Sequence, residues 1–257
     1  MATCVHNAFS MFTGTQTIRT SRIYSGLLLF TVSTTGAFAT EPAAMIDVEY
    51  LGKQLQRTQL AKVAPFTGTR VYRLKNSRMN EPAEMVVKVD SHPEAGRTFE
   101  IVSARGSEMV KNRVFKKILE AEAEESRHAT RRADITPRNY DFKLLGTEMV
   151  NGHPCYMVEL LPKQKSKYLL NGKAWIDQKD FEVVKLEGRT SASVSFWVGK
   201  PYIQSEYQKI NGYWVASKNQ SHTSTAFLGT SELTVEFKEY QFQDQRNTEL
   251  AKAAAQQ

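Results

Sequence analysis

The sequence predicts a mainly β (α+β) protein with about ten antiparallel strands and two amphipathic helices. Asn-Gly pairs mark the centre of the chain at Asn151-Gly152, Asn171-Gly172 and Asn211-Gly212. Both central residues of a type I′ turn need positive φ, which Asn tolerates and Gly adopts freely, so such a pair between alternating apolar and polar residues predicts a hairpin. The flanking segments are rich in aromatic residues, which suit a half-buried sheet. We therefore expect a meander of about seven strands between Tyr140 and Phe242.

Three further strands are predicted before the meander, and each shows alternating or short apolar patterns. They are Phe66–Lys75, Met85–Val89 and Arg97–Ala104. Within the meander the predicted strands are Tyr140–Val150, His153–Leu161, Tyr168–Asp177, Phe181–Arg189, Tyr202–Ile210, Tyr213–Thr223 and Ser231–Phe242. The pair Asn171-Gly172 is compatible with a turn or with a bulge inside one strand.

The first helix is predicted over Glu41–Val63, with Pro42 in its first turn and Pro65 beyond its end. Its apolar stripe consists of Ala44, Val48, Leu51 and Leu55.

The second helix is predicted over Ser107–Arg127, with Ser107 as its N-cap. Its stripe consists of Val110, Val114, Ile118 and Ala121. Four glutamates crowd its C-terminal end, where the helix dipole disfavours anions, namely Glu120, Glu122, Glu124 and Glu125. They form either a solvated face or a docking surface for a basic partner. A polar linker, His128–Arg138, is expected to lead into the meander.

Residues 1–39 are typical of a secretory signal peptide. Arg19 and Arg22 precede the apolar run Ile23–Val32, and a small-residue segment ends in Ala37-Phe38-Ala39. The apolar run is too short to span a bilayer, and the alternative is a buried N-terminal helix. We expect cleavage after Ala39, a single domain over residues 40–242, a flexible tail over 243–257, and a soluble periplasmic protein.

Charge and cysteine content limit the classes of partner. Loss of Arg19 and Arg22 lowers the formal net charge from +7 to +5, a modest excess that does not require nucleic acid. No nucleic-acid partner is therefore expected, and the chain is expected to be a monomer.

Cys4 lies in the predicted signal peptide, so Cys155 remains as a lone thiol that forms no internal disulfide.

The sequence offers little for catalysis, and we predict no enzyme, no cofactor and no metal site. The four histidines after the signal peptide make no metal-ligand spacing with one another or with Cys155; they are His92, His128, His153 and His222. Cys155 and His153 share a predicted strand face, where a Cys–His dyad competes with a buried cysteine that acts as a small hydrophobe. Glu148 and Glu159 are read as acids on solvated strand faces.

A sheet of about ten strands has a large concave face, and two helices can cover only part of it. The remaining space is either an apolar ligand cavity or a packed core, and the pattern alone favours neither. If a cavity exists, we expect it to be lined by the inward-facing strand residues and the second helix, namely Tyr72, Leu74, Phe99, Ile101, Val110, Val114, Ile118, Tyr156, Val158, Leu160, Leu233, Val235 and Phe237.

Several segments resemble proteins of the outer-membrane lipoprotein-sorting type. They are Asn139–Gly146, Gly152–Tyr156 with Glu159–Lys163, Gly172–Asp177, Ser195–Val198, Glu206–Lys209 and Gly212–Trp214. This resemblance to the LolA/LolB-type superfamily implies an incomplete antiparallel β-barrel, plugged by helices, that encloses a cavity for acyl chains. Carriers of that superfamily keep an arginine on an early strand that helps to hold the helical lid shut, and Arg70 and Arg73 both lie in a comparable strand.

The resemblance implies two functions from different classes. The first is a periplasmic carrier for lipid or for lipoprotein acyl chains, which would exchange its cargo with a membrane donor or acceptor protein. The second is a sensor or interaction module of the same fold that binds a partner protein in envelope stress or assembly.

Overall fold

The computed structural model describes residues 46–60, 64–93, 95–127, 133–194, 199–225 and 229–243. The predicted signal peptide and most of the predicted tail lie outside these residues. In chain order the helical elements are α1 (Val48–Leu60), the π-helical segment η2 (Val110–Phe115) and α2 (Lys116–Arg127). The strands are β1 (Phe66–Asn76), β2 (Ala83–His92), β3 (Gly96–Arg105), β4 (Tyr140–Val150), β5 (His153–Pro162), β6 (Leu170–Asp177), β7 (Val183–Thr190), β8 (Tyr202–Ile210), β9 (Tyr213–Thr225) and β10 (Gly229–Phe242).

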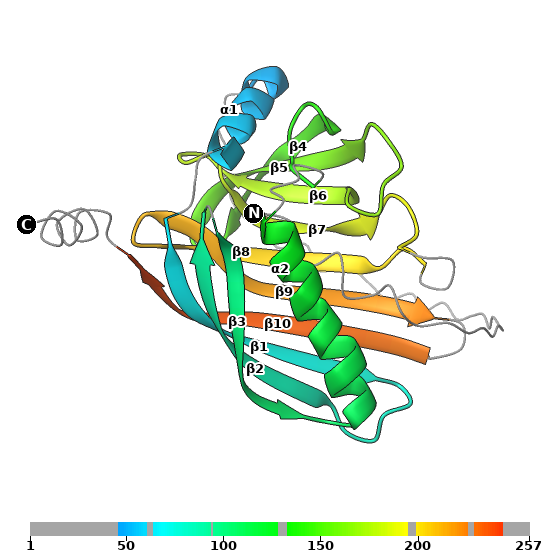
Figure 1. Ribbon diagram of the computed structural model, residues 1–257. Helices are drawn as coiled ribbons and strands as arrows, with labels where there is room; N and C mark the ends of the chain where they lie inside the picture. The colour runs from blue at the N-terminus through cyan, green and yellow to red at the C-terminus, as the bar shows by residue number, and fades with distance from the viewer. Residues whose placement is uncertain are drawn as a thin grey trace, which may run out of the picture.

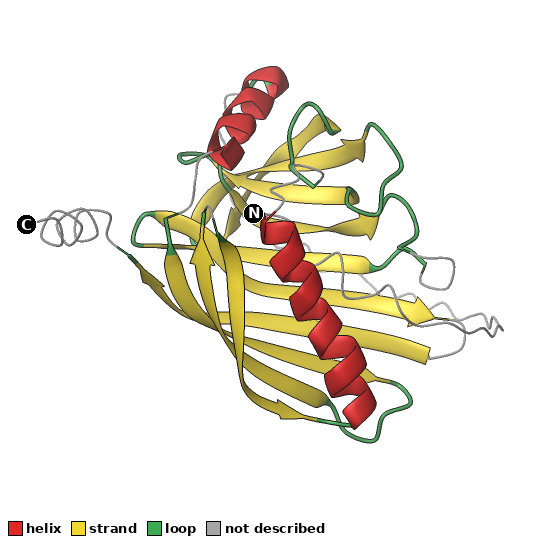
Figure 2. Ribbon diagram, in the orientation of Figure 1, coloured by secondary structure: helices red, strands yellow, loops and turns green. Residues whose placement is uncertain are grey.

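All ten strands form one antiparallel sheet in the order β3-β2-β1-β10-β9-β8-β7-β6-β5-β4. The chain runs as a meander from β4 to β10, and the first hairpins join the sheet where β1 pairs with β10. The sheet curls without closing, so that β3 and β4 are its two ends, and the helices lie across it (Figures 1 and 2). The predicted incomplete β-barrel with two helices is confirmed.

Two of the three Asn-Gly pairs form the predicted hairpin turns. Asn151 and Gly152 have φ of 51° and 81°, and Asn211 and Gly212 have 50° and 86°. The third pair is not a turn, because Asn171 and Gly172 lie inside β6. Nor does it mark a bulge, since the register of β6 against β7 shifts between Trp175 and Ile176.

Gly172 is needed for close strand approach. It pairs with Gly188 on β7, and a Cβ atom on Gly172 would lie 2.0 Å from the carbonyl oxygen of Glu187. Such a contact is far below a van der Waals separation, so the two backbones approach closely only because neither residue has a side chain.

Helix α1 begins later than the sequence suggests, since Ile46 and Asp47 precede it without helical structure. The Asp47 carboxylate accepts a hydrogen bond from the backbone N–H of Glu49 at 3.1 Å and so acts as the N-cap. Pro42 and Ala44, assigned to this helix from the sequence, lie outside the described residues. Leu51 and Leu55 are fully buried, as the stripe predicts.

The segment before β4 is not simply a polar linker. Ala133 and Ile135 are buried, and the Gln59 side chain of α1 makes two hydrogen bonds with the backbone of Ile135, at 2.9 and 3.2 Å. Gly52 lets α1 approach this segment, because a Cβ there would lie 2.8 Å from the ring of Pro137. The predicted polar linker therefore contains buried residues that pack against α1.

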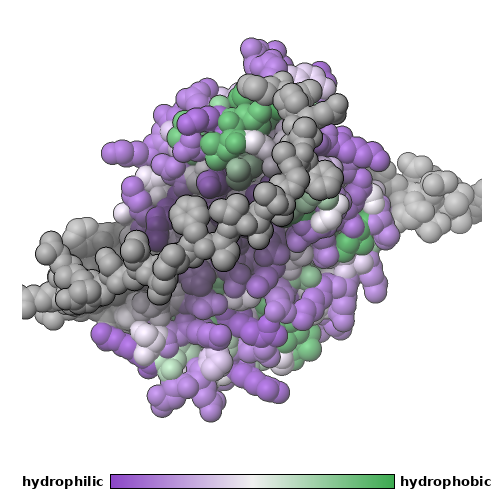
Figure 3. All heavy atoms as spheres, turned by 180° about the vertical axis from the view of Figure 1, so that it is seen from behind, coloured by the Kyte–Doolittle hydropathy of each residue, from purple (hydrophilic) through white to green (hydrophobic). Residues whose placement is uncertain are grey.

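The apolar residues gather in two clusters. We call one the α1 cluster, because Leu51 and Leu55 of α1 pack in it against β4–β8. The other, the α2 cluster, contains the stripe of η2 and α2 packed on β1, β2 and β10. The opposite face of the sheet is largely polar, and hydrophilic side chains predominate in the view from behind (Figure 3). Within the described residues, neither helix has the length and hydrophobicity that a membrane span requires.

Replacing Gly172 with Ala is expected to destabilise the sheet by about 1–3 kcal/mol, because the new Cβ overpacks the β6–β7 contact. Thermal and urea unfolding followed by circular dichroism measure the change. Gly199→Ala is the matched control, since a Cβ there meets no atom of the described residues within 4 Å. Equal stability of the two variants would show that the strands can separate slightly at no cost.

Candidate functional site

The candidate site is the concave face of the sheet, where the two clusters contain almost all of the predicted cavity residues. The α2 cluster contains Tyr72, Leu74, Val110, Val114, Ile118, Leu233, Val235 and Phe237, with Phe99 partly buried against it. The α1 cluster contains Val158 and Leu160, with Tyr156 partly buried against it. Ile101 belongs to neither cluster and is 53% exposed, since it lies on the end strand β3. Whether these residues contact a ligand remains a prediction.

A buried ion pair joins helix α2 to this face. Arg70 of β1 donates from Nη1 to a carboxylate oxygen of Glu122, and the Tyr72 hydroxyl donates to the other oxygen at 3.0 Å. Both charged side chains are about 95% buried. The guanidinium of Arg70 also lies over the rings of Phe99 and Phe237, at 5.4 and 4.9 Å from their centroids. Cation–π contacts of this kind stabilise a guanidinium in an apolar setting.

Arg70, rather than Arg73, therefore holds the helix. Arg73 lies on the outer face of the sheet, where it binds Glu84 at 2.9 Å and Glu236 at 2.6 Å while remaining 39% exposed. The two arginines differ because residues three apart on a strand point to opposite faces. Of the two arginines, Arg70 is the one that pairs with a residue of α2.

The partner carboxylate was missed in the sequence. The sequence predicts that Glu122 belongs with its neighbouring glutamates to a solvated face or a docking surface, and both predictions are wrong for this residue, which is 4% exposed. The available signal was spacing, because Val110, Val114, Ile118 and Glu122 recur at intervals of four and so share one helix face. Glu120, by contrast, is exposed, as expected.

The thiol of Cys155 lies in a setting that disfavours reactivity. The residue is fully buried, and its Sγ donates to the backbone oxygen of His153 at 3.3 Å. Burial, together with the nearby Asp177 carboxylate, raises the pKa of the thiol to about 11. The His153 ring instead contacts Asp177, with Nδ1 3.0 Å from Oδ2. This geometry agrees with the interpretation of Cys155 as a small buried hydrophobe.

Glu148 and Glu159 each have a partner of their own. Glu148 accepts a hydrogen bond from the indole of Trp175 at 2.7 Å, and Glu159 faces Lys143 at 3.9 Å. Among the described residues, no group of three or more His, Cys, Asp or Glu side chains is arranged to hold a metal ion.

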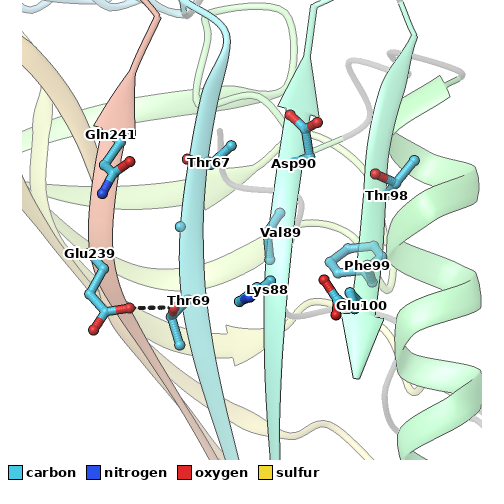
Figure 4. A pocket seen from close by; sticks show the side chains of 11 residues that line it. Thr67, Thr69, Lys88, Val89, Asp90, Thr98, Phe99, Glu100, Glu239 and Gln241 are labelled. Atoms are coloured by element: carbon cyan, nitrogen blue, oxygen red, sulfur yellow. Dashed lines mark hydrogen bonds between the residues drawn. The ribbon is translucent and has the colours of Figure 1, made fainter. Parts of the chain in front are cut away.

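A polar pocket of about 500 Å³ crosses the ends of β10, β1, β2 and β3 (Figure 4). It is lined by Thr67, Gly68, Thr69, Lys88, Val89, Asp90, Thr98, Phe99, Glu100, Glu239 and Gln241. Glu239 has a φ of 56° at a bulge in β10, and its carboxylate accepts a hydrogen bond from the Thr69 hydroxyl at 2.5 Å. This pocket does not match the predicted apolar cavity, with which it shares only Phe99.

The chain is similar to solved structures of the lipoprotein-sorting type. It is 14% identical to a putative outer membrane lipoprotein-sorting protein domain from Vibrio parahaemolyticus, with 77% of this chain and 94% of that chain covered and a TM-score of 0.40. It is also 14% identical to a LolA superfamily protein from Nitrosomonas europaea, with 78% and 95% covered and a TM-score of 0.39. The MucA/MucB complex of Pseudomonas aeruginosa matches at 12% identity, with 75% and 93% covered and a TM-score of 0.25.

The profile of a family described as "Uncharacterized protein" matches residues 128–250, which is less than half of the chain. No curated protein matches the chain. At these identities and TM-scores the solved structures do not carry a function over to this chain.

Removing the carboxylate of the ion pair is expected to destabilise the fold strongly. Glu122→Ala should cost about 3–5 kcal/mol, because the Arg70 charge stays buried without this carboxylate. Urea unfolding measures the loss, and Glu120→Ala on the exposed side of α2 is the control, expected within about 0.5 kcal/mol of wild type. Restoration of most of the stability in Arg70→Met/Glu122→Leu would support the pair, whereas equal effects of Glu122→Ala and Glu120→Ala would contradict it.

Cys155 is expected to resist alkylation in the folded protein. In a chain that starts at Thr40, where Cys155 is the single thiol, iodoacetamide at pH 8 should react slowly before unfolding and quickly in urea, because burial and the raised pKa suppress the thiolate. Mass spectrometry follows the reaction. Comparable rates in both states would mean that the thiol is accessible, and would reopen a redox or nucleophilic role.

Proposed function

We propose that this protein is a carrier for an apolar ligand, a lipid or an acyl chain, which binds against the concave face beneath the helices. The observation that carries the proposal is the buried Arg70–Glu122 pair, which together with the Tyr72 hydroxyl fastens an amphipathic helix over an apolar face. Burial of acyl chains on such a face contributes about 25 cal/mol per Å².

In this proposal α2 has a closed state, with the ion pair formed, and an open state, with the pair separated, and the two states differ in free energy. With the pair formed, η2 and α2 cover the α2 cluster. Movement of α2 away from the sheet exposes both charges to water, which solvates them well. It also exposes the apolar stripe, which the ligand then has to cover. Ligand chains and the helix would compete for the same apolar surface, so binding and release are coupled to movement of α2.

An interaction module is the second candidate, and the two end strands favour it. Among the described strands, β3 pairs only with β2 and β4 pairs only with β5. Large apolar side chains on these strands are exposed, with Ile101 at 53%, Val102 at 55% and Met149 at 64%. A partner segment could therefore add to an open edge as a further strand.

The proposed site of action is outside the cytoplasm. This part of the proposal rests on residues 1–39, in which two arginines, an apolar run and Ala37-Phe38-Ala39 follow one another in the order of a secretory signal peptide.

Binding of a fluorescent fatty-acid probe tests the carrier proposal. On the carrier proposal, Val158→Trp is expected to lower probe affinity at an almost unchanged melting temperature, because the indole ring then occupies ligand space on the concave face instead of displacing packed side chains. Glu159→Trp is the matched control, since the next residue on the strand points to the outer face, and its probe affinity should equal that of wild type.

Two outcomes separate the candidates. Probe binding by wild type and its loss in Val158→Trp alone support the carrier. A wild type that never binds the probe, with a Val158→Trp melting temperature that falls as expected from about 1–3 kcal/mol of overpacking, identifies a filled core and leaves the interaction module.

A further inference from the structure

A strip of small polar side chains crosses the concave face between the two apolar clusters. It consists of Asn219, Ser221 and Thr223 on β9, with Ser205 on β8 and Ser231 on β10, and each is at most 7% exposed. We call these five residues the polar strip. The strands that carry them lie in the middle of the sheet, between the α1 and α2 clusters (Figure 1).

The strand register places the strip on the same face as α2. Asn219 lies opposite Val235, and Val235 lies opposite Tyr72, whose hydroxyl binds Glu122 of α2. Residues 219, 221 and 223 alternate along one strand and therefore point to the same side. The strip thus faces the region in which the proposed ligand lies.

The neighbours of the strip are apolar or very small. Across the sheet, Ser221 lies between Leu233 and Ile203, and the next residue in that row is Gly188. In the adjacent row, Asn219 lies between Val235 and Ser205, followed by Leu186. The strip is therefore the polar centre of a face that is otherwise hydrophobic on both sides.

Three atoms of the strip are buried without a hydrogen-bond partner in the described structure. They are Oδ1 of Asn219, Oγ of Ser221 and Oγ1 of Thr223. By contrast, Ser231 accepts a hydrogen bond from Nδ2 of Asn76 at 2.8 Å. Native proteins satisfy most buried polar groups, so three orphaned atoms on consecutive inward positions of one strand require an explanation.

The charge of the face limits what can satisfy these atoms. The two rows that contain Asn219 and Ser221 carry no charged side chain among their described residues, and the nearby Arg70 is bound to Glu122. A carboxylate or phosphate at the strip would lie buried without a counter-charge, which is costly. An uncharged group that both donates and accepts hydrogen bonds has no such cost.

We infer that the polar strip binds the uncharged hydrogen-bonding group of an amphiphile, such as the ester, amide or hydroxyl of an acylglyceride, while its acyl chains lie on the two apolar clusters. The inference rests on the proposed carrier function and narrows its ligand class from any apolar chain to a neutral, ester- or amide-linked lipid. A free fatty acid, with its ionised carboxylate, fits the strip less well.

Displacement of a fluorescent apolar probe by monolauroylglycerol, laurate and dodecane tests the inference, since the three share one chain and differ in the polar group. Wild type is expected to bind the glyceride most tightly. Ser221→Ala/Thr223→Val should weaken glyceride binding about tenfold, the effect of losing one or two hydrogen bonds, and leave probe and dodecane binding unchanged. Thr234→Val, on the outer face of β10, is the matched control and should bind all ligands as wild type does.

The melting temperature of the ligand-free variant gives a second measurement. Because the two hydroxyls have no hydrogen-bond partner among the described residues, Ser221→Ala/Thr223→Val should be as stable as wild type or more stable, and a clear loss of stability would show that they serve the fold instead. Probe binding without a preference for the glyceride, or with a preference that survives in the double variant, overturns this inference and leaves the carrier standing. A wild type that binds no probe overturns both.

Discussion

The buried pair of Arg70 on β1 and Glu122 on α2 fixes where α2 lies on the sheet. Apolar burial alone is non-directional, and a stripe spaced at four residues can pack on a flat apolar surface in several registers. A buried charge is tolerated only beside its partner, so displacement of α2 by one turn would separate the pair at a cost of several kcal/mol. The hydroxyl of Tyr72 adds a second constraint on the same carboxylate. The position of α2, in turn, decides how much of the concave face is covered.

The strands could be predicted closely because their signals are local. β4 and β8 agree with the predicted bounds at both ends, and two hairpin turns follow from their Asn-Gly pairs. Asn171-Gly172 shows the limit of such signals. Gly172 is required because a Cβ atom at this position would clash with β7 beside Gly188. The sequence of β6 alone does not show which residue of β7 lies opposite. The start of α1 and the packing of residues 133–138 depend equally on contacts between distant segments.

The apolar residues of the site could be predicted from the sequence, but its buried polar residues could not. The apolar stripe of α2 and the inward residues of β1 and β10 follow from periodicity, and the structure places them in one cluster. Glu122 lies on the same periodic face, but its charge suggested solvent. The polar strip gave no signal, because residues 219–223 of β9 are polar at every position, so alternation cannot show which side is buried. Only the pairing of β9 with β8 and β10 reveals the inward face.

On the proposed carrier function, the polar groups of the concave face have a role that apolar burial cannot fill. Burial holds an acyl chain in proportion to its area and fixes neither its depth nor its direction. Hydrogen bonds at Asn219, Ser221 and Thr223 would hold one group of the ligand at the centre of the sheet, so that its chains extend toward the two clusters. The cost of three orphaned atoms in the ligand-free protein then lowers its stability and raises the affinity of the ligand that satisfies them. A face built for stability alone would have carried valine or alanine at these three positions.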